Sequence, residues 1–370
     1  MKRKVDIESS VVSYYTSSAR TRCETIVTLD VMNRYFRWLL LAPLLTITAC
    51  TTISLPHTSI TETGKVLFAD NFQGKSIDTN HWTAVKGTWT VVDGAVRGVE
   101  LESDHHPAVL RADVPFTDAV IHFRFKLEGS DFLSLGLNQA TGHHSHIVIT
   151  PEGFALQKNA DKKDPRSLTL PLGRCNVPLQ QGIWYAMTVE CCGDTMLVCL
   201  EDKNFVIGTQ EQIHTPKSNI NLVVRGSSAS FDDISVQTAT PSAGKTALIE
   251  QLRAQQAARH DVASDPRVAY MEAETLLRDR LMKTDATFND LLNNRIAIEQ
   301  VLQKRWPKAF RPGTIGVEFR KKMLADNADF KTLNATLAKA RKAEWDYLLK
   351  QDPQLAKLRE AMLKAQPAKK

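Results

Sequence analysis

"AVIHFRFKLEGSDFLSLGLNQATGHHSHIVITPEGFALQKN", residues 119–159, decides the fold. Apolar and polar residues alternate in "AVIHFRFKL", in "FLSLGLNQ" and in "HIVIT". Successive side chains of a strand point to opposite faces of a sheet, so each segment would turn one apolar face to a core. The Glu152-Gly153 pair that follows is typical of a hairpin turn. We therefore predict consecutive antiparallel strands.

The same pattern extends over residues 64–238. Short alternating segments follow one another there, and Asp93-Gly94 and Gly193-Asp194 supply further hairpin turns. Periodic runs of helical length are absent from this region. The sequence predicts a mainly β fold, with one β-sandwich over 64–238.

Residues 239–370 have a different period. After "TATPSAG" the apolar residues recur at helical spacing, and Asp265-Pro266 and Asp352-Pro353 are helix-start pairs. We predict a separate α-helical C-terminal region, interrupted near "WPKAFRPG", residues 306–313.

The charge also divides the chain in two. Residues 51–240 contain 15 Lys and Arg against 21 Asp and Glu, whereas residues 241–370 contain 25 against 16. A basic helical region suits anionic lipid, an acidic cell-wall polymer or a protein partner in the envelope, but a solvated helical bundle that spaces or docks the sandwich is the interpretation that we favour. No nucleic-acid motif accompanies it, and we expect no nucleic-acid partner.

"MNRYFRWLLLAPLLTITAC", residues 32–50, has a short basic start and an apolar run of secretory length. Its last four residues resemble the bacterial lipobox, which implies lipidation at Cys50; a plain signal peptide is the alternative. Residues 1–31 fit no part of a signal peptide and are expected to be a start-site extension. We expect the Ser/Thr-rich residues 51–63 to be a tether. The expected location is the bacterial cell envelope outside the cytoplasm, periplasmic or on the surface, with the membrane reached through the lipid.

Four cysteines remain after the tether. Cys191 and Cys192 would point to opposite faces of a strand. If Gly193-Asp194 is the turn, Thr188 faces Cys199 and Cys192 faces Thr195, which leaves Cys192 and Cys199 too far apart for a disulfide. Four cysteines allow three pairings, and both buried free thiols and disulfides stay open.

Polar residues on the far face of the predicted strands are the candidate ligand-binding residues. If the strands are neighbours in one sheet, they form one surface: His122, Arg124, Ser134, Asn138 and His146. His105 or His106 could reach its rim. Planar hydrogen-bonding groups and nearby aromatic rings suit sugars, and the aromatic candidates are Trp82, Trp89 and Trp184, although core packing is the alternative for Trp89 and Trp184.

His144 and His146 are the candidate catalytic residues, because imidazole titrates near neutral pH. At i, i+2 on a strand they would share a face, which also permits a divalent metal, but no third ligand can be placed and we predict no cofactor. The acidic cluster of Glu100, Glu102 and Asp104 departs from the E-x-D-x-x-E pattern of sandwich glucanases. A retaining glucanase mechanism is therefore not expected.

The sandwich resembles a bacterial concanavalin A/laminin G-like domain, and in particular the 3-keto-disaccharide hydrolase domain family. The resemblance lies in "LFADNFQGKSIDTNHWTAVKGTWTVVDGAVRG", "GHHSHIVITPEGFALQKNA" and "LVVRGSSASFDDISVQ", and covers about half the chain. It implies a concanavalin A-like (jelly-roll) sandwich and activity on 3-keto-glycosides, which could begin with loss of a proton beside the ketone. Three functions follow: a lipoprotein that binds carbohydrate, a 3-keto-glycoside hydrolase or lyase-like enzyme, or a structural envelope protein.

Overall fold

The computed structural model describes residues 58–259, 261–311 and 313–365. Residues 1–31, the signal segment 32–50 with Cys50, and most of the tether 51–63 lie outside the described residues. Among the described helices, none is long and apolar enough to cross a membrane.

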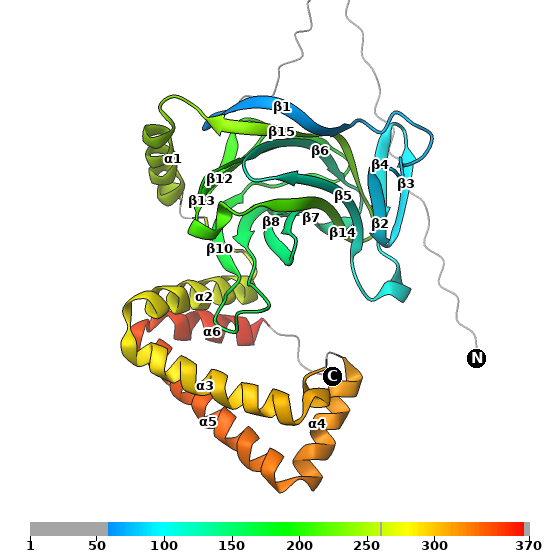
Figure 1. The fold of residues 1–370 in the computed structure, drawn as a ribbon. Helices are drawn as coiled ribbons and strands as arrows, with labels where there is room; N and C mark the ends of the chain where they lie inside the picture. Colours follow the sequence, from blue (N-terminus) through cyan, green and yellow to red (C-terminus); the bar gives the residue numbers. More distant parts are fainter. Residues whose placement is uncertain (1–57, 260, 312, 366–370) are drawn as a thin grey trace, which may run out of the picture. The chain divides into compact units, whose positions relative to one another are not determined.

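Two antiparallel sheets form a β-sandwich, as predicted, and appear as stacked layers in Figure 1. Sheet A contains eight strands, with the order β13-β12-β11-β6-β15-β4-β3 and β1 paired to β15. Its strands are β1 (Thr61–Asp70), β3 (Thr88–Val92), β4 (Ala95–Val99), β6 (Ala119–Leu127), β11 (Trp184–Cys192), β12 (Thr195–Leu200), β13 (Asn204–Thr209) and β15 (Ala229–Pro241). Sheet B has the order β10-β9-β8-β7-β14-β5-β2. Its strands are β2 (Trp82–Lys86), β5 (Ala108–Phe116), β7 (Ser130–Gln139), β8 (Gly142–Thr150), β9 (Gly153–Lys158), β10 (Leu170–Asn176) and β14 (Lys217–Gly226).

The core lies between the sheets and follows the predicted alternation. Phe123 and Phe125 of β6 and Leu135 of β7 are fully buried, as are Ile147 and Ile149 of β8. Burying a side chain of this size stabilises the fold by about 1.5–3 kcal/mol. The apolar faces of both sheets thus supply the main driving force for folding.

The β11–β12 hairpin has the predicted register. Thr188 is opposite Cys199, and Cys192 is opposite Thr195. Cys191 packs in the main core and Cys192 packs on the other face of sheet A. In the described part of the chain, the four cysteines Cys175, Cys191, Cys192 and Cys199 are free thiols.

The sandwich is longer at both ends than the predicted 64–238. β1 begins at Thr61, inside the expected tether, and β15 continues to Pro241. At the N-terminal end the physical reason is Glu190, a residue that is 1% exposed. It accepts hydrogen bonds from the backbone N–H groups of Ser59, Ile60 and Thr61 at 2.8–2.9 Å, and from the Thr61 hydroxyl at 2.7 Å.

The C-terminal region is helical, as predicted. It contains α1 (Lys245–Arg259), α2 (Pro266–Thr284), α3 (Ala286–Arg305), α4 (Thr314–Asp326), α5 (Ala328–Gln351) and α6 (Gln354–Lys364). Short 3-10 helices occur at η1 (Glu102–Asp104), η2 (Glu211–Ile213) and η3 (Pro307–Phe310), the last at the predicted interruption. Asp265, Asp285 and Asn327 cap α2, α3 and α5 through their side chains.

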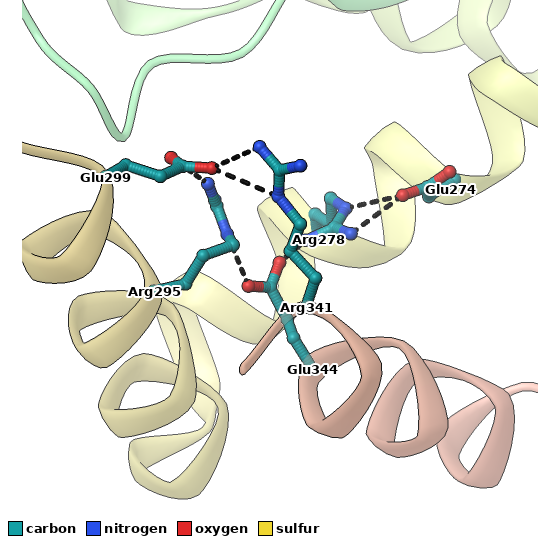
Figure 2. A network of polar contacts seen from close by, with 6 residues as sticks. All are labelled: Glu274, Arg278, Arg295, Glu299, Arg341 and Glu344. Atoms are coloured by element: carbon teal, nitrogen blue, oxygen red, sulfur yellow. Dashed lines mark hydrogen bonds and ion pairs between the residues drawn. The ribbon is translucent and has the colours of Figure 1, made fainter. Parts of the chain in front are cut away.

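A buried ionic network joins three of the helices (Figure 2). Glu344 of α5 is 1% exposed and pairs with Arg278 of α2 and Arg295 of α3. Arg295 and Arg341 also pair with Glu299, and Arg278 pairs with Glu274. The charge of Glu344 is therefore compensated where the helices meet.

Candidate functional site

The outer face of sheet B, which points away from the core, contains two polar rows. The strand registers place one residue from each of six adjacent strands in the first row. In order these are Gln157, His146, Gly136, Asn221, Arg111 and Thr83. The second row contains His143, Asn138, Asn219 and Asp113. We call these two rows the sheet B face; the predicted residues Asn138 and His146 belong to it, and Ser134 lies on the same side of β7.

The ring of His146 lies close to Gly136. A Cβ atom at position 136 would come within 2.9 Å of the His146 ring atoms Cδ2 and Nε2. The His143 ring is 5.3 Å from the His146 ring, centroid to centroid. Gly136 therefore makes the space in which the two imidazoles gather.

A chain of hydrogen bonds orients the second row. His143 Nδ1 is 2.9 Å from Asn138 Oδ1, and Asn138 Nδ2 donates to Asn219 Oδ1 at 2.8 Å. Asn159 Nδ2 lies 3.4 Å from His146 Nδ1. The side chains are thus held in defined directions before any ligand arrives.

The two imidazoles are neutral at pH 7. Burial, with a smaller effect of His143, lowers the pKa of His146 to about 4. Burial also lowers the pKa of His143, and the charges of Lys162, His106 and Arg111 lower it further. A neutral imidazole offers one hydrogen-bond donor and one acceptor, but His146 is a weaker base than an ordinary histidine.

Three buried polar atoms at this face have no hydrogen-bond partner among the described residues. They are Arg111 Nε, Asn159 Oδ1 and Asn221 Oδ1. Buried polar atoms in native proteins are normally paired, and leaving one unpaired costs about 1–3 kcal/mol. All three are shielded from solvent in this conformation, so the face holds polar groups whose hydrogen-bonding capacity is not used.

His122 and Arg124 do not belong to this face, so the predicted single surface is wrong. β6 pairs with β11 and β15 in sheet A, whereas β7 pairs with β8 and β14 in sheet B. The chain changes sheets at Gly129 (φ +94°), which lets the apolar faces of β6 and β7 meet across the core. Arg124 instead pairs with Asp232 and Asp233, and His122 Nδ1 lies 3.3 Å from the Thr188 hydroxyl.

The expected pairing of His144 with His146 also does not occur. A β-bulge in β8 sets Asn138 opposite His143 and Leu137 opposite Ser145, so His144 is the extra residue. His144 is 3% exposed, with Nε2 2.7 Å from Gln212 O and Nδ1 2.8 Å from Ser145 Oγ. His143 takes the place beside His146 that the i, i+2 spacing assigned to His144.

The loop before β5 carries the other predicted residues. His105 and His106 are exposed, and the charge of His106 reaches His143 strongly enough to affect its pKa. The acidic cluster nearby is structural: Asp104 accepts from Gly87 N and Glu100 accepts from Gly226 N, both at 2.7 Å.

None of the three predicted tryptophans lies on the sheet B face. Trp82 and Trp89 are in the core. Trp184, for which core packing was the alternative, is half-buried on sheet A between Arg124 and Lys126. The aromatic ring on the sheet B side is Phe132, with the guanidinium of Arg225 4.6 Å from its centroid.

The contributors that sequence reasoning missed include Arg111, His143, Gln157, Asn219 and Asn221. Alternation in "AVLRADVPF" and "NINLVVRG" marks three of them as outward-facing, but not as members of the same sheet as His146. For metals, no group of three or more His, Cys, Asp or Glu suited to an ion occurs in the described ranges.

No protein-family model and no curated protein matches the sequence. The solved structures similar to it include the carbohydrate-binding module CBM66 from Bacillus subtilis, at 14% identity over 43% of this chain and 96% of that chain (TM-score 0.36). A protein of unknown function with a galectin-like fold from Bacillus subtilis is 13% identical over 50% and 100% (TM-score 0.39). The non-specific endo-β-1,3(4)-glucanase SCLam is 11% identical over 48% and 95% (TM-score 0.37). All three TM-scores are below 0.5, so these similarities assign neither a ligand nor an activity to this chain.

Proposed function

We propose that the sheet B face binds carbohydrate, in a lipid-anchored protein of the bacterial envelope. The observation that carries the proposal is the row of imidazole, amide and guanidinium groups with Arg111 Nε, Asn159 Oδ1 and Asn221 Oδ1 unpaired. Sugar hydroxyls donate and accept at once, so they suit this mixture of donors and acceptors, and the three shielded atoms can be reached once their side chains turn outward. Phe132 places an aromatic ring on the same side of the sheet, with Arg225 stacked over it.

Binding is favoured over catalysis by the low basicity of His146. Removal of a proton beside a ketone needs a base whose pKa is close to the working pH, and the pKa of His146 is about 4. Hydrolysis of 3-keto-glycosides is the second candidate function, because neutral His143 and His146 could polarise a carbonyl by hydrogen bonding. A structural envelope protein is the third.

A glycan array, run in parallel with turnover of 3-keto disaccharides, tests the proposal. We expect His146→Ala and Asn221→Ala to weaken glycan binding at least tenfold, about 1.4 kcal/mol. The control His122→Ala, on sheet A, should leave binding unchanged. If the wild type turns over a 3-keto disaccharide and a folded His146→Ala protein does not, the protein is an enzyme. If the wild type shows no glycan affinity and no turnover, the structural role is the one that remains.

The lipid anchor rests on residues 32–50. Metabolic labelling with palmitate should mark the wild-type protein, and Cys50→Ser should lose the label and leave the membrane fraction. A Cys50→Ser protein that stays membrane-bound would contradict the anchor.

The helical region is proposed to contact the anionic membrane surface. On α4, Ile315 and Val317 are 67% and 43% exposed. Arg320, Lys321 and Lys322 of the same helix form no ion pair among the described residues, so apolar and basic groups are both free for lipid. We expect the protein to co-sediment with phosphatidylglycerol vesicles but not with phosphatidylcholine vesicles. Ile315→Asp should reduce the co-sedimentation.

A further inference from the structure

Two lysines are buried at the same end of the sandwich but differ in their partners. Lys217 is 2% exposed, and its ammonium donates to Ile213 O at 2.5 Å and to Thr117 O at 3.0 Å. Lys158, at the end of β9, is 5% exposed, and no hydrogen bond or ion pair from the described residues reaches its ammonium. Its ammonium is not among the side-chain atoms that are both shielded from solvent and unpaired, and the charges of Asp161 and Asp164 partly offset the lowering of its pKa by burial. Lys217 has a structural role, whereas Lys158 lacks an acceptor.

Lys158 lines a cavity of about 140 Å³. The β8–β9 ladder ends there, with Lys158 opposite Ser145 and Asn159 N donating to His144 O. The other lining residues are Gln139, His143, His144, Asn159, Asp161, Asp164, Ser167, Gln212 and Thr215. The volume far exceeds the roughly 15 Å³ that one water needs.

The walls are preorganised. His144 is fixed between Gln212 O and Ser145 Oγ. One oxygen of Asp161 accepts from Lys163 N, and one of Asp164 accepts from Arg166 N. The second oxygen of each carboxylate accepts no hydrogen bond from the described residues and is free for a ligand.

The charges select the class of ligand. One ammonium and two carboxylates line the cavity, and burial keeps His143 and His144 neutral by lowering their pKa values. An anion would meet both carboxylates, whereas a cation would meet the ammonium. A neutral polyol can accept from Lys158 and donate to Asp161 and Asp164.

We propose that this cavity, the Lys158 pocket, binds one neutral polyhydroxylated unit such as a terminal sugar residue. The inference rests on the proposed carbohydrate function, because His143 belongs both to the pocket and to the sheet B face. A glycan on the face could therefore place its end unit beside Lys158, which would set specificity for that end.

The test combines ligand binding with thermal unfolding of the whole chain. The probes are D-glucose, D-galactose, N-acetyl-D-glucosamine and myo-inositol, with D-glucuronate and inorganic phosphate as anionic counterparts, followed by saturation-transfer NMR and calorimetry. We expect a neutral probe to bind, and Lys158→Met to weaken its binding at least tenfold, because the ammonium that donates to the ligand is removed while the cavity keeps its volume. The matched variant Lys217→Met should lower Tm, because Thr117 O loses its lysine donor and Ile213 O keeps only the Thr215 N–H.

Each other outcome is decisive. Three outcomes would overturn the Lys158 pocket. They are neutral-probe binding that survives in Lys158→Met, tighter binding of glucuronate or phosphate than of the neutral probes, and no binding of any probe. If Asn221→Ala abolishes oligosaccharide binding and Lys158→Met leaves it intact, the proposed function stands and the Lys158 pocket is wrong. If a monosaccharide binds in a Lys158-dependent way and no oligosaccharide binds, the Lys158 pocket stands and carbohydrate binding by the sheet B face is wrong.

Discussion

At the scale of single residues, the environment of His146 decides what the sheet B face can do. An imidazole packed against glycine backbone and a second imidazole loses water, and its charged form is disfavoured. This makes His146 a neutral hydrogen-bonding group with a pKa of about 4. The same residue on an open strand would be an ordinary titrating histidine.

Gly136→Ala tests this packing. The new Cβ would lie 2.9 Å from the ring, so the imidazole must move toward solvent. The pKa of His146, followed by NMR, is expected to rise from about 4 toward 6.5, and overpacking should cost about 1–3 kcal/mol of stability. His122 on sheet A is the internal reference, and an unchanged His146 pKa would contradict the packing.

The pH dependence of stability follows from the same shift. Between pH 6.5 and about 4 the unfolded chain binds a proton at His146 that the folded protein does not, so the stability present above 6.5 is lost as the pH falls. Denaturant titrations over this window should show a shallower loss in His146→Gln than in the wild type. Equal slopes would show that His146 is not buried as described.

At the scale of elements, the buried carboxylate of Glu190 extends the sandwich. Ser59, Ile60 and Thr61 would have unpaired N–H groups at the start of β1, and Glu190 accepts from all three. A charged acceptor makes stronger hydrogen bonds than a neutral one. The first strand is therefore joined to β11, more than a hundred residues away in sequence.

Glu190→Gln should cost about 2–4 kcal/mol, because the amide carries no charge and turns donor hydrogens toward N–H groups. Hydrogen exchange at Ser59–Thr61 is expected to accelerate, and the midpoint of chemical unfolding to fall. Glu62→Gln, at an exposed position of β1, is the control and should match the wild type.

At the scale of the whole molecule, the sandwich and the helical region are held by different interactions. The sandwich buries a large apolar core, whereas the helices have two small cores and the ionic network of Figure 2. Glu344 alone compensates charges on two other helices. The helical region therefore depends on electrostatic pairing more than the sandwich does.

Glu344→Gln should destabilise the helical region by about 3–5 kcal/mol, because Arg278 and Arg295 lose a buried partner. A separate early transition in thermal unfolding, with the sandwich transition unchanged, is the expected measurement. Glu360→Gln, which breaks an exposed pair with Lys364 on α6, should produce no measurable change.

The sequence by itself determined the β-sandwich, the helical C-terminal region, and the register of the β11–β12 hairpin. These depend on local periods and on turn residues, which a linear pattern contains. Even the division between the inward Ile147 and the outward His146 follows from alternation.

Only the tertiary structure decided which polar residues meet. Alternation tells on which side of its own strand a residue lies, but not which sheet that strand joins. The change of sheet at Gly129 removed His122 and Arg124 from the sheet B face, and strand pairing brought Arg111 and Asn221 to it. Because of the bulge in β8, His143 rather than His144 lies beside His146. Such contacts depend on long-range pairing and on one extra residue in a ladder, for which the local sequence pattern has no signal.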